Sequence, residues 1–319
     1  MTSHEDKAPK ATQPLIGLSS TFMGVPRCED FGASSAEVVL TGVPFDLATT
    51  GRAGARSGPT GIRLASTHLT WEENRWPWGF SLPNLLKVED YGDLPFSSGD
   101  PSSMVENLTT HAHDVLKQGK MMLTLGGDHF ITLPLIRAHA QQHGPLALIH
   151  FDSHTDNYAQ GGPFDHGIML REAHREETID PTQTVQIGIR TEYKPNDHPY
   201  TVLDAAWCND NGPEAIAARI REIVGDSPTY LTLDIDCLDP AYAPGTGTPV
   251  VGGLTTDIML KILRRLVGAN IVGMDVVEVA PPFDHAEITS LAAATLTLEL
   301  LHVVAAGKMD PGSGARASG

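Results

Sequence analysis

Length, composition and charge already restrict what this chain can be. It has 319 residues, 41% of them hydrophobic, with 31 glycines and 23 prolines, which is typical of a compact globular enzyme with many loops. Its formal net charge is −17, from 22 Lys and Arg against 39 Asp and Glu. Nucleic acid and anionic membranes are therefore poor partners, whereas a small cationic molecule would be attracted.

The cysteines, the N-terminal sequence and the apolar runs indicate the cellular compartment. Three widely spaced cysteines, Cys28, Cys208 and Cys237, argue against a disulfide framework and favour a reducing environment. The polar start MTSHEDKAPKATQPL does not resemble a secretory signal, and no apolar run approaches the about 20 residues of a membrane span. We therefore expect a cytoplasmic protein.

Strand and helix patterns alternate between a polar N-terminal arm, residues 1–35, and a small polar tail, residues 308–319, which we expect to be disordered. The expected strands are 38–46, 85–93, 121–125, 146–151, 184–189, 229–235 and 271–279, and the expected helices are 104–118, 133–142, one from Pro213, one from about Thr255, and 288–306. Strands that are apolar on both faces and separated by helices predict a parallel sheet covered on both sides. We expect residues 36–307 to form one three-layer α/β/α domain, with its chemistry at the carboxyl ends of the strands.

Acidic and imidazole side chains follow four of these strands. The segments are GGDH (126–129), DSHTD (152–156), DID (234–236) and DVVE (275–278). Residues i and i+2 of a strand face the same side, so such side chains can converge. A lone His or D-x-D at a strand end is often a loop or helix-cap residue, but the joint occurrence of these motifs favours a metal site.

Six of these side chains form a ligand set for two metal ions. Four buried carboxylates would be costly without a partner, and they balance the charge of two divalent cations. Oxygen-rich ligation without thiolate favours Mn²⁺ first, with Zn²⁺, Fe²⁺, Co²⁺ or Ni²⁺ as alternatives. Two ions about 3.5–4 Å apart can lower the pKa of a shared water. The predicted ligands are His129, Asp152, His154, Asp156, Asp234 and Asp236.

Three neighbouring residues have other expected roles. We expect Asp128 and Asp275 to orient ligands rather than bind metal. We expect His150 to point to the opposite face of its strand from Asp152 and to serve as a core histidine.

These segments, together with 41–63 and the whole of 231–255, resemble the signature blocks of the ureohydrolase family of arginases and agmatinases, over about residues 36–305. The blocks WEENRWPW (71–78), FDHG (164–167) and VQIGIRTE (185–192) are more similar to agmatinase than to arginase segments. The resemblance implies an arginase-like fold with about eight strands and two Mn²⁺ ions per subunit. It also implies hydrolysis of a guanidinium to urea and an amine, most closely agmatine to putrescine and urea.

The resemblance further implies roles for single residues. His166 matches the proton-shuttle histidine of the family, and Glu278 matches the carboxylate that binds the guanidinium. Asp156 is expected to act in catalysis as well as in metal binding, and Asn157 is expected to contact substrate together with His166 and Glu278. The implied metal assignment is His129 and Asp156 to one ion, His154 and Asp236 to the other, and Asp152 and Asp234 as bridges.

Three alternatives stay open at this point. The substrate can be another guanidino compound, namely 4-guanidinobutyrate, 3-guanidinopropionate or arginine. The same fold can catalyse deacetylation of an acylated amine. The chain can also be a catalytically silent protein that binds polyamines or a partner. The absence of part of the arginase-type amino-acid anchor, where Thr191, Glu192 and Tyr193 stand, favours agmatine. The resemblance also implies a homo-oligomer, a trimer or hexamer, in which Trp71–Trp78 would form a subunit contact or the pocket mouth.

Overall fold

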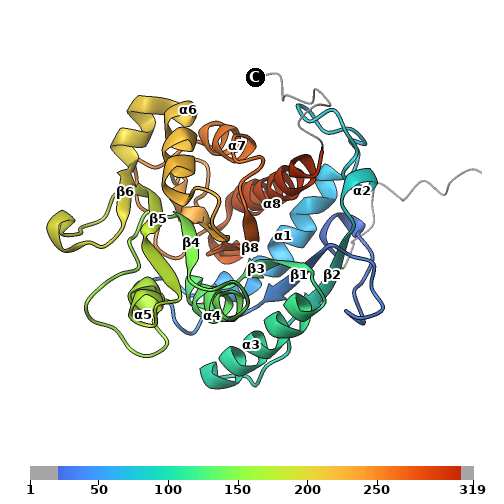
Figure 1. Ribbon diagram of the computed structural model, residues 1–319, viewed down its shortest axis with the longest axis horizontal. Coiled ribbons are helices and arrows are strands. Elements are labelled where there is room, and N and C mark those ends of the chain that lie inside the picture. The colour runs from blue at the N-terminus through green and yellow to red at the C-terminus, as the bar shows by residue number, and fades with distance from the viewer. Residues whose placement is uncertain (1–20, 310–319) are drawn as a thin grey trace, which may run out of the picture.

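The computed structural model describes residues 21–309, which are built around one sheet in the order β2-β1-β3-β8-β7-β4-β5-β6 (Figure 1). The strands are β1 (Val38–Val43), β2 (Val88–Asp93), β3 (Met121–Gly126), β4 (Leu146–Phe151), β5 (Ile179–Ile189), β6 (Thr201–Asp204), β7 (Thr229–Asp234) and β8 (Ile271–Val277). Every pairing between them is parallel. The expected α/β class with a parallel sheet of about eight strands is confirmed.

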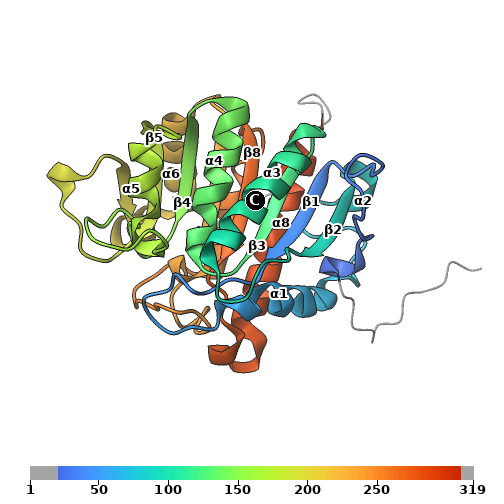
Figure 2. The same ribbon diagram turned by 90° about the horizontal axis from the view of Figure 1, so that it is seen from below.

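Helices cover both faces of the sheet (Figures 1 and 2). One face carries α1 (Gly58–Ser66), α6 (Ala205–Val224), α7 (Thr256–Arg264) and α8 (Ile288–Gly307), with the short α2 (Leu82–Leu85) beside α8; the other carries α3 (Pro101–Lys117), α4 (Thr132–His143) and α5 (Met169–Arg175). Alternate strand residues enter the two cores, since Ile149 and Leu231 pack on the first side while Leu148 and Tyr230 pack on the second. This two-sided burial explains the continuous apolar runs.

Several elements differ from the sequence-based expectation. The helix expected from Pro213 is present, since α6 is kinked at Gly212 (φ of 77°) and its second part starts at Pro213. A first part, which was not predicted, begins at Ala205, where Asp204 accepts the N–H of Trp207 (2.8 Å). β1 ends at Val43, and β5 begins five residues earlier than expected. The short elements α1, α5 and β6 were not predicted, because so few residues show little periodicity.

The expectation that no apolar run approaches the length of a membrane span is wrong for the segment that contains α8. By length and composition alone, His285–Gly307 is apolar enough to cross a membrane. However, 72% of its most apolar stretch is buried inside the protein, where the helix packs on α1 and α7. A helix that is apolar on all sides is expected at the centre of a layered fold.

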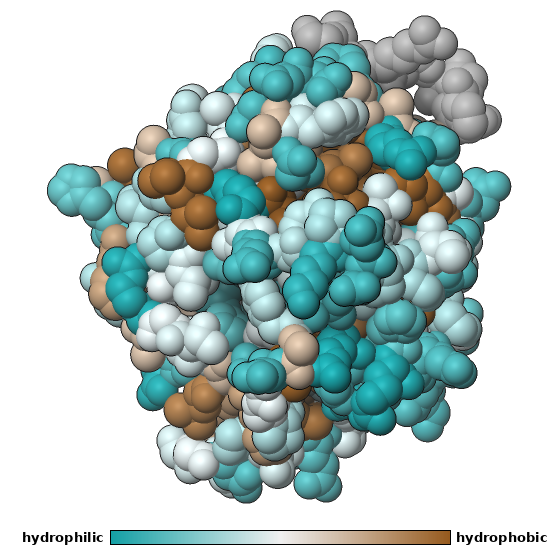
Figure 3. Space-filling view, turned by 90° about the vertical axis from the view of Figure 1, so that its left-hand side faces the viewer, coloured by the Kyte–Doolittle hydropathy of each residue, from teal (hydrophilic) through white to brown (hydrophobic). Residues whose placement is uncertain are grey.

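The N-terminal arm is described only from Thr21 onward. There the N–H of Phe22 donates to Asp90 Oδ2 (2.7 Å), which attaches the arm to β2. Most of the predicted tail lies outside the described residues, but Lys308 forms an ion pair with Glu37. Viewed from the β6 end of the sheet, the surface is mostly hydrophilic, with separate apolar patches (Figure 3).

Candidate active site

His129 reaches the carboxyl edge of the sheet from a sharp turn after β3. Gly127 has φ of 53°, and a Cβ at this position would lie 2.4 Å from the carbonyl oxygen of Val43, so the turn requires glycine. Asp128 caps the following 3-10 helix by accepting the N–H of Phe130 (3.0 Å). Asp128 therefore fixes the backbone around His129, whereas the sequence suggested that it orients a ligand side chain.

The imidazole of His129 faces three carboxylates. Its Nδ1 lies 3.0 Å from Asp152 Oδ2, 3.1 Å from Asp156 Oδ2 and 3.2 Å from Asp234 Oδ2. This nitrogen is buried and has no hydrogen-bond partner. One imidazole nitrogen and three carboxylate oxygens that converge on one point are a donor set suited to a divalent cation.

A chain of hydrogen bonds orients His129 from behind. Its Nε2 donates to Thr232 Oγ1 (2.7 Å), and Thr232 donates to Asp275 Oδ1 (2.6 Å). Asp275 also accepts from the hydroxyls of Thr132 and Tyr230, each at 2.8 Å. Because Thr232 holds Nε2, Nδ1 is the nitrogen of His129 that faces the carboxylates and that would offer its lone pair to a bound cation. Asp275 thus orients His129 through Thr232.

A second cluster adjoins the first. His154 Nδ1 lies 3.3 Å from Asp152 Oδ1 and 3.1 Å from Asp236 Oδ2. Asp152 belongs to both clusters, because its other oxygen faces His129. Asp234 accepts the N–H of Asp236 on Oδ1 (2.8 Å) while its Oδ2 faces His129. The structure therefore brings all six predicted ligands together at one edge of the sheet.

The buried carboxylates of both clusters stabilise a positive charge placed between them. Burial opposes a charge on the imidazoles, yet the carboxylates raise the pKa of His129 well above its usual value and that of His154 to about 12. Burial and the charges of Asp236 and Asp152 raise the pKa of Asp234 well above its usual value. A divalent cation would relieve the same repulsion between buried carboxylates. The residues present fit a metal site.

Glu278 and His166 form a pair beside the first cluster. His166 Nδ1 lies 3.1 Å from Glu278 Oε1, and this oxygen also accepts the N–H of His129 (2.8 Å). Burial opposes a charge on His166, but Glu278 raises its pKa to about 10. Glu278 Oε2 is buried without a hydrogen-bond partner. Glu278 and Asp156 have φ of 64° and 47°, a backbone conformation that costs about 1–3 kcal/mol and is concentrated at functional sites.

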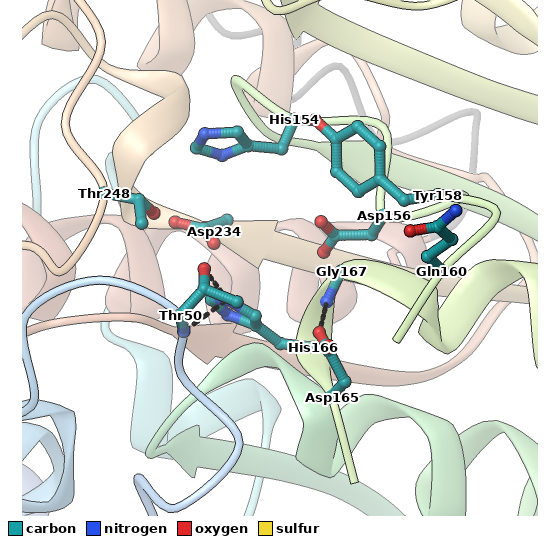
Figure 4. Close-up of a pocket in the computed structure, with 10 residues that line it drawn as sticks. All are labelled: Thr50, His154, Asp156, Tyr158, Gln160, Asp165, His166, Gly167, Asp234 and Thr248. Carbon is teal, nitrogen blue, oxygen red and sulfur yellow. Dashed lines mark hydrogen bonds between the residues drawn. The ribbon is translucent and has the colours of Figure 1, made fainter. Parts of the chain in front are cut away.

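A cavity of about 200 Å³ opens onto His154, Asp156, His166 and Asp234 (Figure 4). In the figure, His154 and the pair of Thr50 and His166 lie on opposite sides of the carboxylates of Asp156 and Asp234. Thr50 donates its N–H to His166 Nε2 (3.1 Å), and its hydroxyl lies 2.9 Å from the same nitrogen. The lining residues, none of which is Lys or Arg, are Thr50, His154, Asp156, Tyr158, Gln160, Asp165, His166, Gly167, Asp234 and Thr248.

Asn157 is not among the residues that line the cavity, whereas Tyr158 and Gln160 are, and its contact with the substrate stays a prediction. One expectation about this site needs correction. His150 does not face away from Asp152: its Nε2 lies 2.9 Å from Asp152 Oδ2, because residues two apart in a strand point to the same side.

The sequence reasoning also missed Thr50 and Thr248 as lining residues. The only signal for them is their position inside the segments 41–63 and 231–255, which resemble family blocks. Each reaches the cavity from a loop, where strand and helix periodicity carry no information about direction.

Known proteins share this fold and sequence. The profile of the arginase family matches residues 36–302. The chain is 60% identical over 299 residues to the agmatinase of Serratia proteamaculans, which covers 94% of this chain and 97% of that protein. A crystal structure of a hypothetical agmatinase from Burkholderia thailandensis has a TM-score of 0.86 and 49% identity, covering 89% of this chain and 90% of the other. Proclavaminate amidino hydrolase from Streptomyces clavuligerus has a TM-score of 0.85 and 37% identity, covering 92% and 100%.

Proposed function

This chain belongs to the arginase family, and from that premise we propose that it hydrolyses agmatine to putrescine and urea. The observation that carries the proposal is the carboxylate of Glu278, whose Oε2 is buried without a partner beside two clusters of His and Asp. An unpartnered buried carboxylate oxygen needs a donor, and a planar guanidinium supplies several N–H groups. The agmatinases that are about 60% identical over most of the chain support the same substrate.

Two divalent ions, Mn²⁺ by preference, belong to this proposal. The two oxygens of Asp152 face His129 and His154 respectively, which supports its role as a bridge. When bound, the ions supply Lewis-acid chemistry that makes water a nucleophile near neutral pH. The proposed assignment is His129 and Asp156 to one ion, His154 and Asp236 to the other, and Asp152 and Asp234 shared.

Glu278 would bind the guanidinium of the substrate, and His166 would protonate the leaving amine. The N–H of His129 and the ring of His166 hold Oε1 of Glu278, so the carboxylate is fixed and Oε2 is left to accept N–H groups of the guanidinium. Although burial opposes the charge, Glu278 raises the pKa of His166 to about 10, so at neutral pH the ring is an imidazolium with one proton on Nδ1, facing Glu278, and one on Nε2, which the hydroxyl of Thr50 can accept. The imidazolium can give a proton to the amine that leaves and become neutral.

The charge of the pocket supports a substrate that carries an ammonium rather than a carboxylate at its far end. Asp165 lines the cavity besides the residues proposed to hold metal, and no Lys or Arg is among the lining residues. Arginine or 4-guanidinobutyrate would bring a carboxylate toward this negative potential, whereas agmatine brings a second positive charge. The overall fold does not decide the substrate, since a neighbour with a TM-score of 0.85 is named as a proclavaminate amidino hydrolase.

The test is urea release by Mn²⁺-loaded protein from agmatine, arginine, 4-guanidinobutyrate and 3-guanidinopropionate. We expect kcat/KM to be at least about tenfold higher for agmatine, since one unfavourable charge contact of about 1.4 kcal/mol changes the ratio by that factor. A higher value for arginine or a guanidino acid would replace the proposed substrate. If wild type, like Asp152→Asn, releases neither urea from these compounds nor the free acid from an acylated amine, the chain is a silent binding protein.

We also propose that residues 36–307 act as one domain in a cytoplasmic homo-oligomer, a trimer or hexamer, without nucleic-acid or membrane partners. The single sheet and the net charge of −17 support this proposal. Trp71 and Trp76, which are 71% and 72% exposed, offer apolar surface for a subunit contact. Light scattering of the purified protein measures the oligomeric state directly.

A further inference from the structure

We propose that His150 is a positioning residue for the shared carboxylate Asp152, held in one tautomer by Gln186 and His198, and that it is not a metal ligand. The inference rests on the metal centre of the proposed function but not on the identity of the substrate. His150 belongs to one group with His129, Asp152 and Asp156, and it is the residue of this group that the proposed function does not assign to a metal ion.

The three residues form a continuous chain across neighbouring strands. His150 of β4 lies directly opposite Gln186 of β5 in the parallel register, and both side chains are fully buried. Gln186 Nε2 lies 2.8 Å from His150 Nδ1 and 2.7 Å from the carbonyl oxygen of Thr155. Gln186 Oε1 lies 2.6 Å from Nε2 of His198, a half-buried residue in the loop before β6. The chain therefore runs from this loop to Asp152.

One carbonyl group determines the direction of every hydrogen bond in this chain. The oxygen of Thr155 can only accept, so the Gln186 atom that faces it is the amide nitrogen. The second hydrogen of that nitrogen points at His150 Nδ1, which must accept it. The ring proton of His150 is then on Nε2, from which it donates to Asp152 Oδ2 across 2.9 Å. At the other end, His198 donates to Gln186 Oε1.

With both ring nitrogens occupied, His150 has no lone pair to offer a metal ion. Its Nδ1 accepts from Gln186, and its Nε2 carries the proton shared with Asp152. Its ring centre lies 5.2 Å from that of His129, whose unpartnered Nδ1 faces the carboxylates instead. The two buried histidines are close together but have opposite roles.

Asp152 is the group through which His150 would affect both ions. Its Oδ2 accepts from His150, and its Oδ1 accepts the backbone N–H of His154 (2.6 Å). Two donors on different oxygens fix the rotation of the carboxylate that both clusters share. Loss of the donor on Oδ2 would allow Asp152 to turn away from His129, and partners of this kind commonly contribute strongly to metal affinity.

The test is calorimetric titration of the metal-free full chain with Mn²⁺, which does not depend on turnover. His150→Leu removes the donor, and we expect it to weaken Mn²⁺ binding about 10- to 100-fold while two sites per chain remain. His150→Gln places an N–H near the position of Nε2 and should stay within about threefold of wild type. His150→Phe keeps a buried aromatic ring of similar size without any donor and should weaken binding as His150→Leu does. His302→Gln, a buried histidine on α8 bonded to Leu298, is the matched control and should bind as wild type does.

The titrations distinguish a positioning role of His150 from a metal-ligand role and from a packing role. Loss of one Mn²⁺ per chain in both His150→Leu and His150→Gln would make His150 a ligand and overturn the inference. Wild-type affinity in His150→Leu and His150→Phe would leave only a packing role and also overturn it. If His150→Leu does not fold, His150→Phe carries the decision. A wild type that binds two Mn²⁺ but releases no urea from agmatine refutes the proposed function and not this inference, whereas a wild type that binds no Mn²⁺ refutes both.

Discussion

The backbone N–H of His129 donates to Glu278 Oε1 across 2.8 Å. This bond joins a residue that faces the carboxylate clusters to the carboxylate proposed to hold the guanidinium. His129 follows β3 and Glu278 follows β8, which are neighbours in the sheet, so the bond links two adjacent strand ends. The distance between the proposed metal site and the substrate carboxylate is therefore set by the sheet itself.

Glu278→Gln tests this arrangement. The amide oxygen can still accept from His129, but its NH₂ group would face the guanidinium donors with donors of its own. A hydrogen bond to a charged group contributes about 1.5–3 kcal/mol, so kcat/KM for agmatine should fall by about 100-fold. Steady-state urea release measures this, with metal analysis as the control, because the Mn²⁺ content should equal that of wild type. An unchanged kcat/KM would remove Glu278 from substrate binding.

Asp234→Asn should have opposite effects on stability with and without metal. In metal-free protein, burial and the nearby charges of Asp236 and Asp152 disfavour ionised Asp234, so the neutral Asn should raise the melting temperature by about 2 °C. In Mn²⁺-loaded protein the order should reverse, because an amide is a weaker ligand than a carboxylate. Scanning calorimetry with a chelator and with excess Mn²⁺ measures both. The exposed Asp257→Asn, which loses a surface ion pair with Lys261, serves as the control and should respond equally in both states. A metal-free Asp234→Asn that melts below wild type would contradict the repulsion argument.

Thr50→Val tests a lining residue that only the structure revealed. Valine keeps the backbone N–H on His166 Nε2 but removes the hydroxyl 2.9 Å from it. One neutral hydrogen bond contributes about 0.5–1.5 kcal/mol, so kcat should fall about 3- to 10-fold, with Mn²⁺ content unchanged. Thr67→Val, whose exposed hydroxyl bonds only the carbonyl of Leu64, is the matched control and should keep full activity. Equal kcat values for the two variants would rule out a role of the Thr50 hydroxyl in orienting His166.

His302 should make the protein less stable in mild acid. Burial lowers the pKa of His302 to about 4, whereas the unfolded chain takes up this proton near pH 6.5. Its contribution to the free energy of unfolding is therefore fully present above pH 6.5 and is lost as the pH falls toward 4. Urea unfolding at pH 7.5 and 5.0 should show a smaller difference for His302→Gln than for wild type, while the exposed His68→Gln should match wild type. A difference as large as that of wild type in His302→Gln would assign the acid sensitivity to other groups.

Much of the site could be predicted from the spacing of residues within single strands. The D-x-H-x-D and D-x-D segments predicted convergent side chains because alternate strand residues share a face, and the structure brings those five residues together with His129. The same rule, applied correctly, places His150 on the face of Asp152, which the sequence-based expectation did not. Asn157 shows the opposite case: it lies beyond the strand end, where the alternation no longer determines which side chain enters the cavity.

The sequence by itself determined the layered fold, because strands that are apolar on both faces must be covered on both faces, and it determined which residues end those strands. Only the tertiary structure decided which strand ends are neighbours. The bond from Thr50 to His166 spans 116 residues, and the pairing of His150 with Gln186 depends on β4 lying beside β5. Periodicity reports the face of a residue, whereas its partners depend on strand order and register, which are set by the packing of the whole chain.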